Sequence, residues 1–94
     1  MKLTKKQIEA IQFYKLGKVT EAINCFESSI NENENNELIF ESLGICYMEI
    51  GKYEKSIKNF SKVLNLNSHS EKSIYSIINL LNIIRPKNFK NNNL

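Results

Sequence analysis

The residues best suited to chemistry in this sequence are a single histidine and two cysteines. His69 lies between Ser68 and Ser70, and no second ligand, paired carboxylate or activated nucleophile accompanies it. A helix start is therefore a better interpretation of this stretch than a catalytic base. Cys25 and Cys46 fit no metal-binding spacing and form no disulfide framework. We interpret both as reduced, small and buried side chains.

Four lysines form the other cluster that suggests chemistry. They recur at spacings of three and four residues and would make a basic ridge along one helix, the lysine ridge: Lys52, Lys55, Lys58 and Lys62. Glu54 lies nearby and no arginine interleaves with the ridge, so we expect no nucleic-acid partner. A solvated outer face is the favoured interpretation. Binding of an acidic surface through the ridge and the basic tail is a weaker alternative.

The composition excludes several other classes of site. The chain has no aspartate, the commonest ligand of calcium and magnesium sites, and its three glycines form no phosphate-binding loop. We therefore expect no enzyme, no metal and no cofactor. With 94 residues, 41% hydrophobic and 24% charged, the chain resembles one small globular domain. No apolar run approaches the roughly 20 residues that cross a bilayer, and no secretory signal opens the sequence. We expect a cytoplasmic protein with no membrane contact.

The sequence repeats itself at an interval of about 34 residues. Small, aromatic and aliphatic residues coincide in one register, which indicates two copies of one unit. The matched pairs are Ala10 and Gly44, Phe13 and Tyr47, Leu16 and Ile50, Gly17 and Gly51, Lys18 and Lys52, Val19 and Tyr53, Ala22 and Ser56, Ile23 and Ile57, Phe26 and Phe60, and Ile30 and Leu64.

Each copy is predicted to be a pair of antiparallel helices. Apolar residues recur at spacings of three and four on both sides of a short turn. Gly17 and Gly51 stand where the first helix of each copy should end in a left-handed conformation. Gly44 lies on the inner stripe, where the missing side chain lets the partner helix approach, with Tyr47 and Phe60 filling the space on either side. The turn of about two residues makes each pair a helical hairpin.

A third copy begins but stops after one helix. Ser68 and Glu71 have capping-box spacing. Arg85 and Pro86 replace the glycine and lysine that follow the first helix in the other copies, and proline blocks helix continuation. Ile78 replaces the close-contact glycine. We predict a single domain over residues 1–86, with repeat one at 3–36, repeat two at 37–70, a capping helix at 69–85 that covers the flank of the second hairpin, and a flexible polar tail at 87–94.

This pattern resembles the tetratricopeptide repeat, whose signature has the same period. In the second copy, the residues that match the signature are Phe40, Leu43, Gly44, Tyr47 and Phe60. This copy departs from the signature at Ser56, Val63 and Ser68. The first copy keeps fewer of its positions. The resemblance implies an all-α solenoid of helical hairpins, five antiparallel helices in a right-handed superhelix. Residues that would build the repeat are Ala10, Phe13, Gly17, Ala22, Phe26, Phe40, Leu43, Gly44, Tyr47, Gly51, Tyr53 and Phe60.

The resemblance also implies a concave groove, lined by the first helix of each pair, that binds a peptide or helix of another protein. By the geometry of the family its residues would be Gln7, Ile11, Tyr14, Lys15, Leu38, Glu41, Ser42, Ile45, Met48, Glu49, Lys72, Tyr75, Asn79 and Asn82. Ile11, Tyr14, Ile45, Met48 and Tyr75 would give it an apolar strip. An equally weighted interpretation is that each of these side chains merely covers a seam between helices.

Two further interpretations concern the partner. Members of the family that clamp a C-terminal carboxylate carry lysine, two asparagines, lysine and arginine at fixed groove positions. The matching residues here are Gln7, Ile11, Ser42, Lys72 and Ser76, so only Lys72 agrees and a carboxylate clamp is not expected. The alternative to a groove ligand is a self-associating subunit, a homodimer through the groove or the repeat flanks, because two hairpins and a cap fall short of the usual three repeats.

Overall fold

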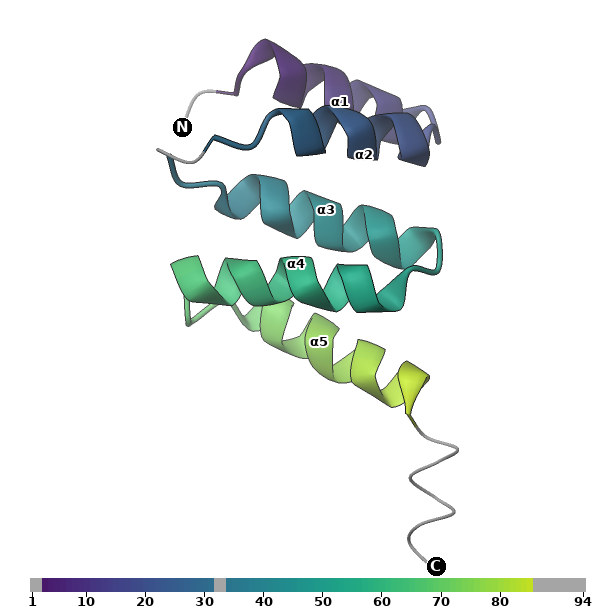
Figure 1. The fold of residues 1–94 in the computed structure, drawn as a ribbon, viewed down its shortest axis with the longest axis vertical. Helices are drawn as coiled ribbons and strands as arrows, with labels where there is room; N and C mark the ends of the chain where they lie inside the picture. Colours follow the sequence, from purple (N-terminus) through teal and green to yellow (C-terminus); the bar gives the residue numbers. More distant parts are fainter. Residues whose placement is uncertain (1–2, 32–33, 86–94) are drawn as a thin grey trace, which may run out of the picture.

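The computed structural model describes residues 3–31 and 34–85, which form five helices and no strand within those ranges (Figure 1). The helices are α1 (Lys5–Lys15), α2 (Val19–Ser28), α3 (Glu37–Glu49), α4 (Tyr53–Leu66) and α5 (Glu71–Ile84). Successive helices run in opposite directions, and each packs chiefly on the next one along the chain. The all-α stack of helical hairpins predicted from the sequence is confirmed. Pro86 and the tail at 87–94 lie outside the described residues.

Two glycines end the first helix of each hairpin in the same way. Gly17 has a φ of +78° and Gly51 a φ of +80°, the left-handed conformation that the sequence predicts. The backbone N–H of Lys18 donates to the carbonyl of Phe13 at 2.9 Å, and the equivalent bond after α3 also measures 2.9 Å. These bonds satisfy carbonyls that the helix end would otherwise leave without a partner. The chain then reverses at once into α2 or α4.

Substitution of either turn glycine by alanine should destabilise the chain through the backbone alone. A β-carbon at Gly51 would meet nothing within 4 Å, so the cost comes from the positive φ. We expect Gly51→Ala to lower the free energy of unfolding by about 1–2 kcal/mol, measured by urea denaturation. Gly51→Asn should cost less, because asparagine tolerates the left-handed region better. Equal losses for the two variants would contradict this account.

The contact between α3 and α4 centres on Gly44. A β-carbon built there would lie 2.8 Å from the ring of Phe60, a side chain that is completely buried. The ring therefore lies on the glycine itself, and does not flank it as predicted from the sequence. Tyr47 turns its hydroxyl outward and donates to Glu27 at 2.8 Å. Ser56, where alanine is usual, donates a hydrogen bond to the carbonyl of Gly44 at 2.6 Å, which satisfies its buried hydroxyl.

The core continues through the stack on both sides of this contact. On one side, buried side chains of α1, α2 and α3 form one cluster, which consists of Ala10, Ala22, Ile23, Phe26, Ile39, Leu43, Cys46 and Tyr47. On the other side, Val63 of α4 and Leu80 of α5 are completely buried. Buried apolar side chains are therefore found in every helix of the stack, from α1 to α5.

The last helix begins later than predicted, and the face that it buries is not the one that carries Ile78. The N-cap is Ser70, whose hydroxyl accepts from the backbone N–H of Ser73, so the prediction of a cap at Ser68 is wrong. Residues 68–69 form a turn instead. The side chains that α5 buries are Ser73 and Leu80. In the repeat register these positions correspond to Ile39 and Cys46, with which α3 packs on the preceding hairpin.

Candidate functional site

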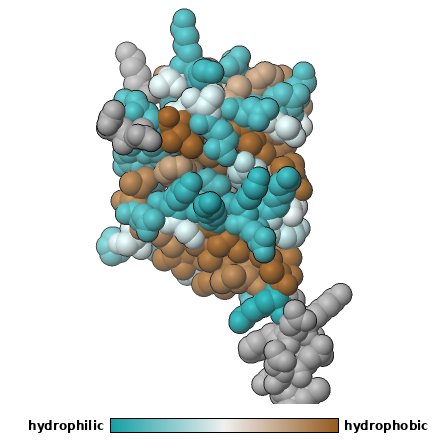
Figure 2. Space-filling model, viewed as in Figure 1, coloured by the Kyte–Doolittle hydropathy of each residue, from teal (hydrophilic) through white to brown (hydrophobic). Residues whose placement is uncertain are grey.

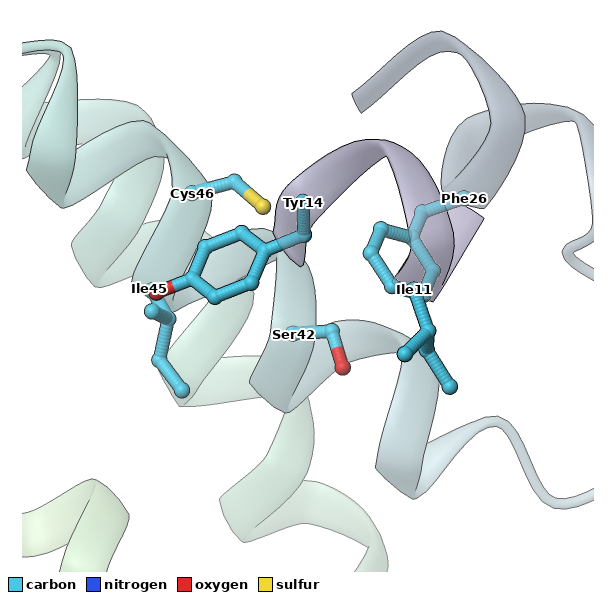
Figure 3. A pocket seen from close by; sticks show the side chains of 6 residues that line it. All are labelled: Ile11, Tyr14, Phe26, Ser42, Ile45 and Cys46. Atoms are coloured by element: carbon cyan, nitrogen blue, oxygen red, sulfur yellow. The ribbon is translucent and has the colours of Figure 1, made fainter. Parts of the chain in front are cut away.

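An apolar hollow opens between α1 and α3 (Figure 3). Its volume is about 110 Å³, and we call it the α1–α3 hollow. It is lined by Ile11 and Tyr14 of α1, Phe26 of α2, and Ser42, Ile45 and Cys46 of α3. Four of these six side chains are among the predicted groove residues. Phe26 and Cys46 were not assigned to the groove from the sequence.

The helical spacing of its residues explains how the α1–α3 hollow forms. Ile11 and Tyr14 are three residues apart on α1, so they project on the same side of the helix. Phe26 is only 3% exposed and belongs to the shared core, so it closes the bottom. Figure 3 shows the Tyr14 ring reaching from α1 toward Ile45 of α3, with Ile11 and Phe26 on the opposite side. An apolar side chain of another molecule would meet mainly carbon atoms here.

Two polar contacts join the first helices of successive units. The hydroxyl of Tyr14 donates to the carboxylate of Glu49, which links α1 to α3. The ammonium of Lys72 lies 3.8 Å from the carboxylate of Glu41, which links α5 to α3. The hydrogen bond to Glu49 and burial raise the pKa of Tyr14 to about 12, so this hydroxyl stays neutral at physiological pH. These four residues were assigned to the groove from the sequence, but their pairing was not predicted.

The two cysteines are free thiols, and Cys46 is buried as interpreted from the sequence. Cys25 is only half-buried, so the prediction that both side chains are buried is wrong for this residue. Burial, followed by the charge of Glu49, raises the pKa of Cys46 to about 11. Burial also raises the pKa of Cys25, whose thiol donates a hydrogen bond to Glu9 at 3.6 Å. Both thiols are therefore protonated at neutral pH and offer little thiolate for nucleophilic chemistry or metal binding.

The remaining predicted groove residues lie outside the lining of the α1–α3 hollow. Gln7 belongs to a capping box: the N–H of Gln7 donates to the hydroxyl of Thr4, and the N–H of Thr4 donates to the side chain of Gln7. The spacing of a threonine three residues before a glutamine would have revealed this role. Met48 and Glu41 are half-buried, whereas the exposed residues are Lys15, Leu38, Glu49, Lys72, Tyr75, Asn79 and Asn82.

The lysine ridge is partly engaged with aromatic rings of α3. The ammonium of Lys55 lies 5.5 Å from the centre of the Tyr47 ring, and that of Lys62 lies 5.2 Å from the centre of the Phe40 ring. Cation–π contacts of this length stabilise a pair by about 0.5–1 kcal/mol at exposed sites. This role as a cover for α3 agrees with the interpretation of the ridge as an outer face.

The described part of the chain holds neither a cluster of metal ligands nor a membrane-spanning helix. Within residues 3–31 and 34–85, no three histidine, cysteine or acidic side chains gather closely enough to hold a metal ion. In the same ranges, no helix has the length and apolar character that would let it cross a membrane. The α1–α3 hollow is accordingly the feature from which we argue function.

Comparison with known proteins adds two findings. A family model described as the tetratricopeptide repeat matches residues 39–70. A stretch of 67 residues, 71% of the chain, is 39% identical to anaphase-promoting complex subunit 3 of Schizosaccharomyces pombe. The chain spans about 10% of the length of that relative.

Proposed function

Because this chain is a tetratricopeptide-repeat domain, we propose that it is a non-enzymatic scaffold which binds a helix or short segment of another protein in the α1–α3 hollow. The observation that carries the proposal is the set of half-buried apolar side chains, Ile11, Tyr14 and Ile45, around a partly open hollow. Apolar side chains with polar neighbours are typical of surfaces that hold a peptide anchor. The similar yeast protein is named as a subunit of a complex, which agrees with a partner-holding role.

The charges around the hollow favour a partner with an uncharged anchor. The Glu49 carboxylate accepts a hydrogen bond from Tyr14, and Lys72 lies beside Glu41, so these charged groups already have partners within the chain. A volume of about 110 Å³ admits one aliphatic or aromatic side chain. We therefore expect a segment with one apolar residue seated between α1 and α3, and flanking polar residues along the exposed parts of α3 and α5.

Binding should depend on the apolar walls of the hollow. Peptides selected from a random displayed library against the wild-type chain should lose at least about tenfold in affinity for Ile45→Lys, because the lysine places a charge in an apolar contact. Tyr14→Phe should retain binding, since it keeps the ring and removes only the hydroxyl bound to Glu49. Isothermal titration calorimetry would measure both affinities.

A matched control separates binding from folding. Lys58→Glu changes an exposed residue of α4 outside the hollow, so it should bind the selected peptides as the wild type does. Far-ultraviolet circular dichroism should show the same helix content for all variants. If no selected peptide distinguishes the wild type from Ile45→Lys, the α1–α3 hollow is not the binding site.

A further inference from the structure

A polar hollow opens on the side of the stack that carries the lysine ridge. Its volume is about 170 Å³, and we call it the lysine hollow. It is lined by Glu27 of α2, Tyr47 of α3, and Lys55, Lys58, Asn59 and Lys62 of α4. Figure 2 shows hydrophilic side chains gathered across the middle of the stack, above the hydrophobic end at α5. No residue lines both this hollow and the α1–α3 hollow, so the two are separate.

The lysine hollow carries more positive than negative charge. Lys55, Lys58 and Lys62 recur at spacings of three and four, so their side chains project on one side of α4. Within the described residues, none of the three forms an ion pair. In the same part of the chain, the lining has one acidic side chain, Glu27, whose carboxylate accepts a hydrogen bond from Tyr47 at 2.8 Å. Three positive charges therefore stand against one negative charge, which leaves two unmatched in the hollow.

Contacts with aromatic rings hold two of the three ammonium groups against α3. The ammonium of Lys55 lies over the Tyr47 ring, and that of Lys62 lies over the Phe40 ring. A cation–π contact attracts an ammonium group but does not neutralise its charge. The side-chain N–H of Asn59, which is only 7% exposed, donates to the backbone carbonyl of Lys55 at 2.9 Å. An anion would therefore meet side chains that already have fixed positions, which lowers the entropy cost of binding.

We propose that the lysine hollow binds a phosphate group carried by a phosphorylated side chain of a partner protein. A phosphorylated serine or threonine has a charge of about −1.5 to −2 at neutral pH, which matches the two unmatched positive charges. A carboxylate would match only one of them. Each lysine ammonium group has three hydrogen-bond donors for the acceptor oxygens of the phosphate. The weaker interpretation from the sequence, an acidic surface bound through the lysine ridge, is thereby narrowed to three of its four lysines and to one chemical group.

The surroundings of the lysine hollow favour a protein over a nucleic acid as the source of the phosphate. Single-stranded nucleic acids bind in basic grooves where the bases stack on aromatic rings. At this hollow, lysine side chains lie over the rings of Tyr47 and Phe40, and Tyr47 is only 8% exposed. A volume of about 170 Å³ has room for one phosphate group and not for a run of nucleotides. A phosphorylated protein as the source also rests on the proposed function, in which the partner is a protein.

Nuclear magnetic resonance titrations of the full chain at low salt would measure this binding. A short glycine–serine peptide with one phosphoserine should shift the backbone amide signals of Lys55, Lys58 and Lys62, and the shifts should saturate with a dissociation constant of about 1 mM or below. The same peptide without the phosphate should cause no saturable shift. Inorganic phosphate should compete for the site but bind more weakly, because the peptide adds backbone contacts around the phosphate.

Two matched variants separate the lysine hollow from the lysine ridge as a whole. Lys58→Gln removes one charge from the hollow and should weaken phosphopeptide binding at least about fivefold, because a charged hydrogen bond is lost. Lys52→Gln makes the same change of charge on the same ridge, but Lys52 does not line the hollow, so the loss should stay below about twofold. Both side chains are exposed, so the helix content should be unchanged in either variant.

Glu27→Gln should change the affinity in the opposite direction. The amide oxygen of glutamine can still accept the hydrogen bond from Tyr47, so the local packing is retained. The substitution removes the negative charge from the described lining, and the phosphopeptide should therefore bind at least about threefold more tightly. A purely structural role for these residues would not strengthen binding.

Four results would overturn the proposal. They are equal losses of affinity in Lys58→Gln and Lys52→Gln, an unchanged affinity in Glu27→Gln, equal binding of the peptide with and without its phosphate, and inorganic phosphate bound as tightly as the phosphopeptide. A single-stranded oligonucleotide that binds more tightly than the phosphopeptide would also overturn it, in favour of a nucleic acid. Ile45→Lys should bind the phosphopeptide as the wild type does, because Ile45 lines only the α1–α3 hollow, so this proposal and the proposed function fail separately.

Discussion

We expect Phe60→Ala to destabilise the chain by about 3–5 kcal/mol. The Phe60 ring is completely buried and lies on Gly44, at the contact between α3 and α4. Removing it would open a cavity in the middle of the stack, where neither helix can collapse without losing its contact with the next one. Since small domains are stable by only about 5–15 kcal/mol, a large part of the total would be lost. Urea denaturation followed by circular dichroism measures the change.

Phe40→Ala provides the matched control for this truncation. It removes a ring of the same size from α3, but the Phe40 side chain is only half-buried and carries Lys62 above it. Its loss should therefore cost clearly less than that of Phe60. Equal costs for the two variants would show that the α3–α4 contact is not centred on Phe60.

The second large effect is expected for Gly44→Leu, which should destabilise the chain by about 1–3 kcal/mol. A β-carbon at Gly44 would already lie 2.8 Å from ring atoms of Phe60, closer than real carbon atoms approach, and leucine adds three more carbons. Because the ring is completely buried, it cannot swing away from the added side chain without disturbing its own packing. Thermal unfolding of the variant beside the wild type measures this loss. An unchanged melting temperature would contradict the close contact.

A double-mutant cycle identifies Phe60 as the cause of this cost. Gly44→Ala adds only the β-carbon, and its intrinsic gain in helix propensity of about 1 kcal/mol opposes the steric cost. In a Phe60→Leu background the crowding should be relieved, so Gly44→Ala should become more favourable there by about 0.5–3 kcal/mol. Additive effects of the two substitutions would exclude a direct contact. Gly51→Ala, in contrast, should introduce only backbone strain. The comparison therefore separates a glycine needed for close helix contact from a glycine needed for its positive φ.

The sequence predicted best those features that a repeating register imposes. Gly17, Gly44 and Gly51 each have the role inferred from their spacing, because a turn or a close helix contact admits few other residues. The last helix was predicted less well. In the repeat register, the apolar residues of α5 stand at the positions of the inner stripe of α3. The residues that α5 buries, however, are Ser73 and Leu80. No described helix follows α5 to cover its other face, and the register alone does not show which face stays uncovered.

The sequence also did not predict which side chains form pairs near the hollow. Tyr14 and Glu49 are not equivalent positions of the two repeats, and they meet because α1 and α3 lie close on one side. Half-burial of Ile11 and Ile45 likewise depends on how closely those two helices approach, which no spacing rule specifies. The sequence also could not decide which serine caps α5, because Ser68 and Ser70 are chemically equivalent candidates.

The linear order of the stack has a mechanical consequence. Each helix packs chiefly on its neighbours in sequence, and the α3–α4 interface is the most extensive of them. Among the described helices α1 and α5 lie at opposite ends of the row (Figure 1), so a pulling force applied to these ends would be carried in series by one interface after another. The least extensive interfaces, between α2 and α3 and between α4 and α5, would then open first, and the pair around Gly44 would rupture last.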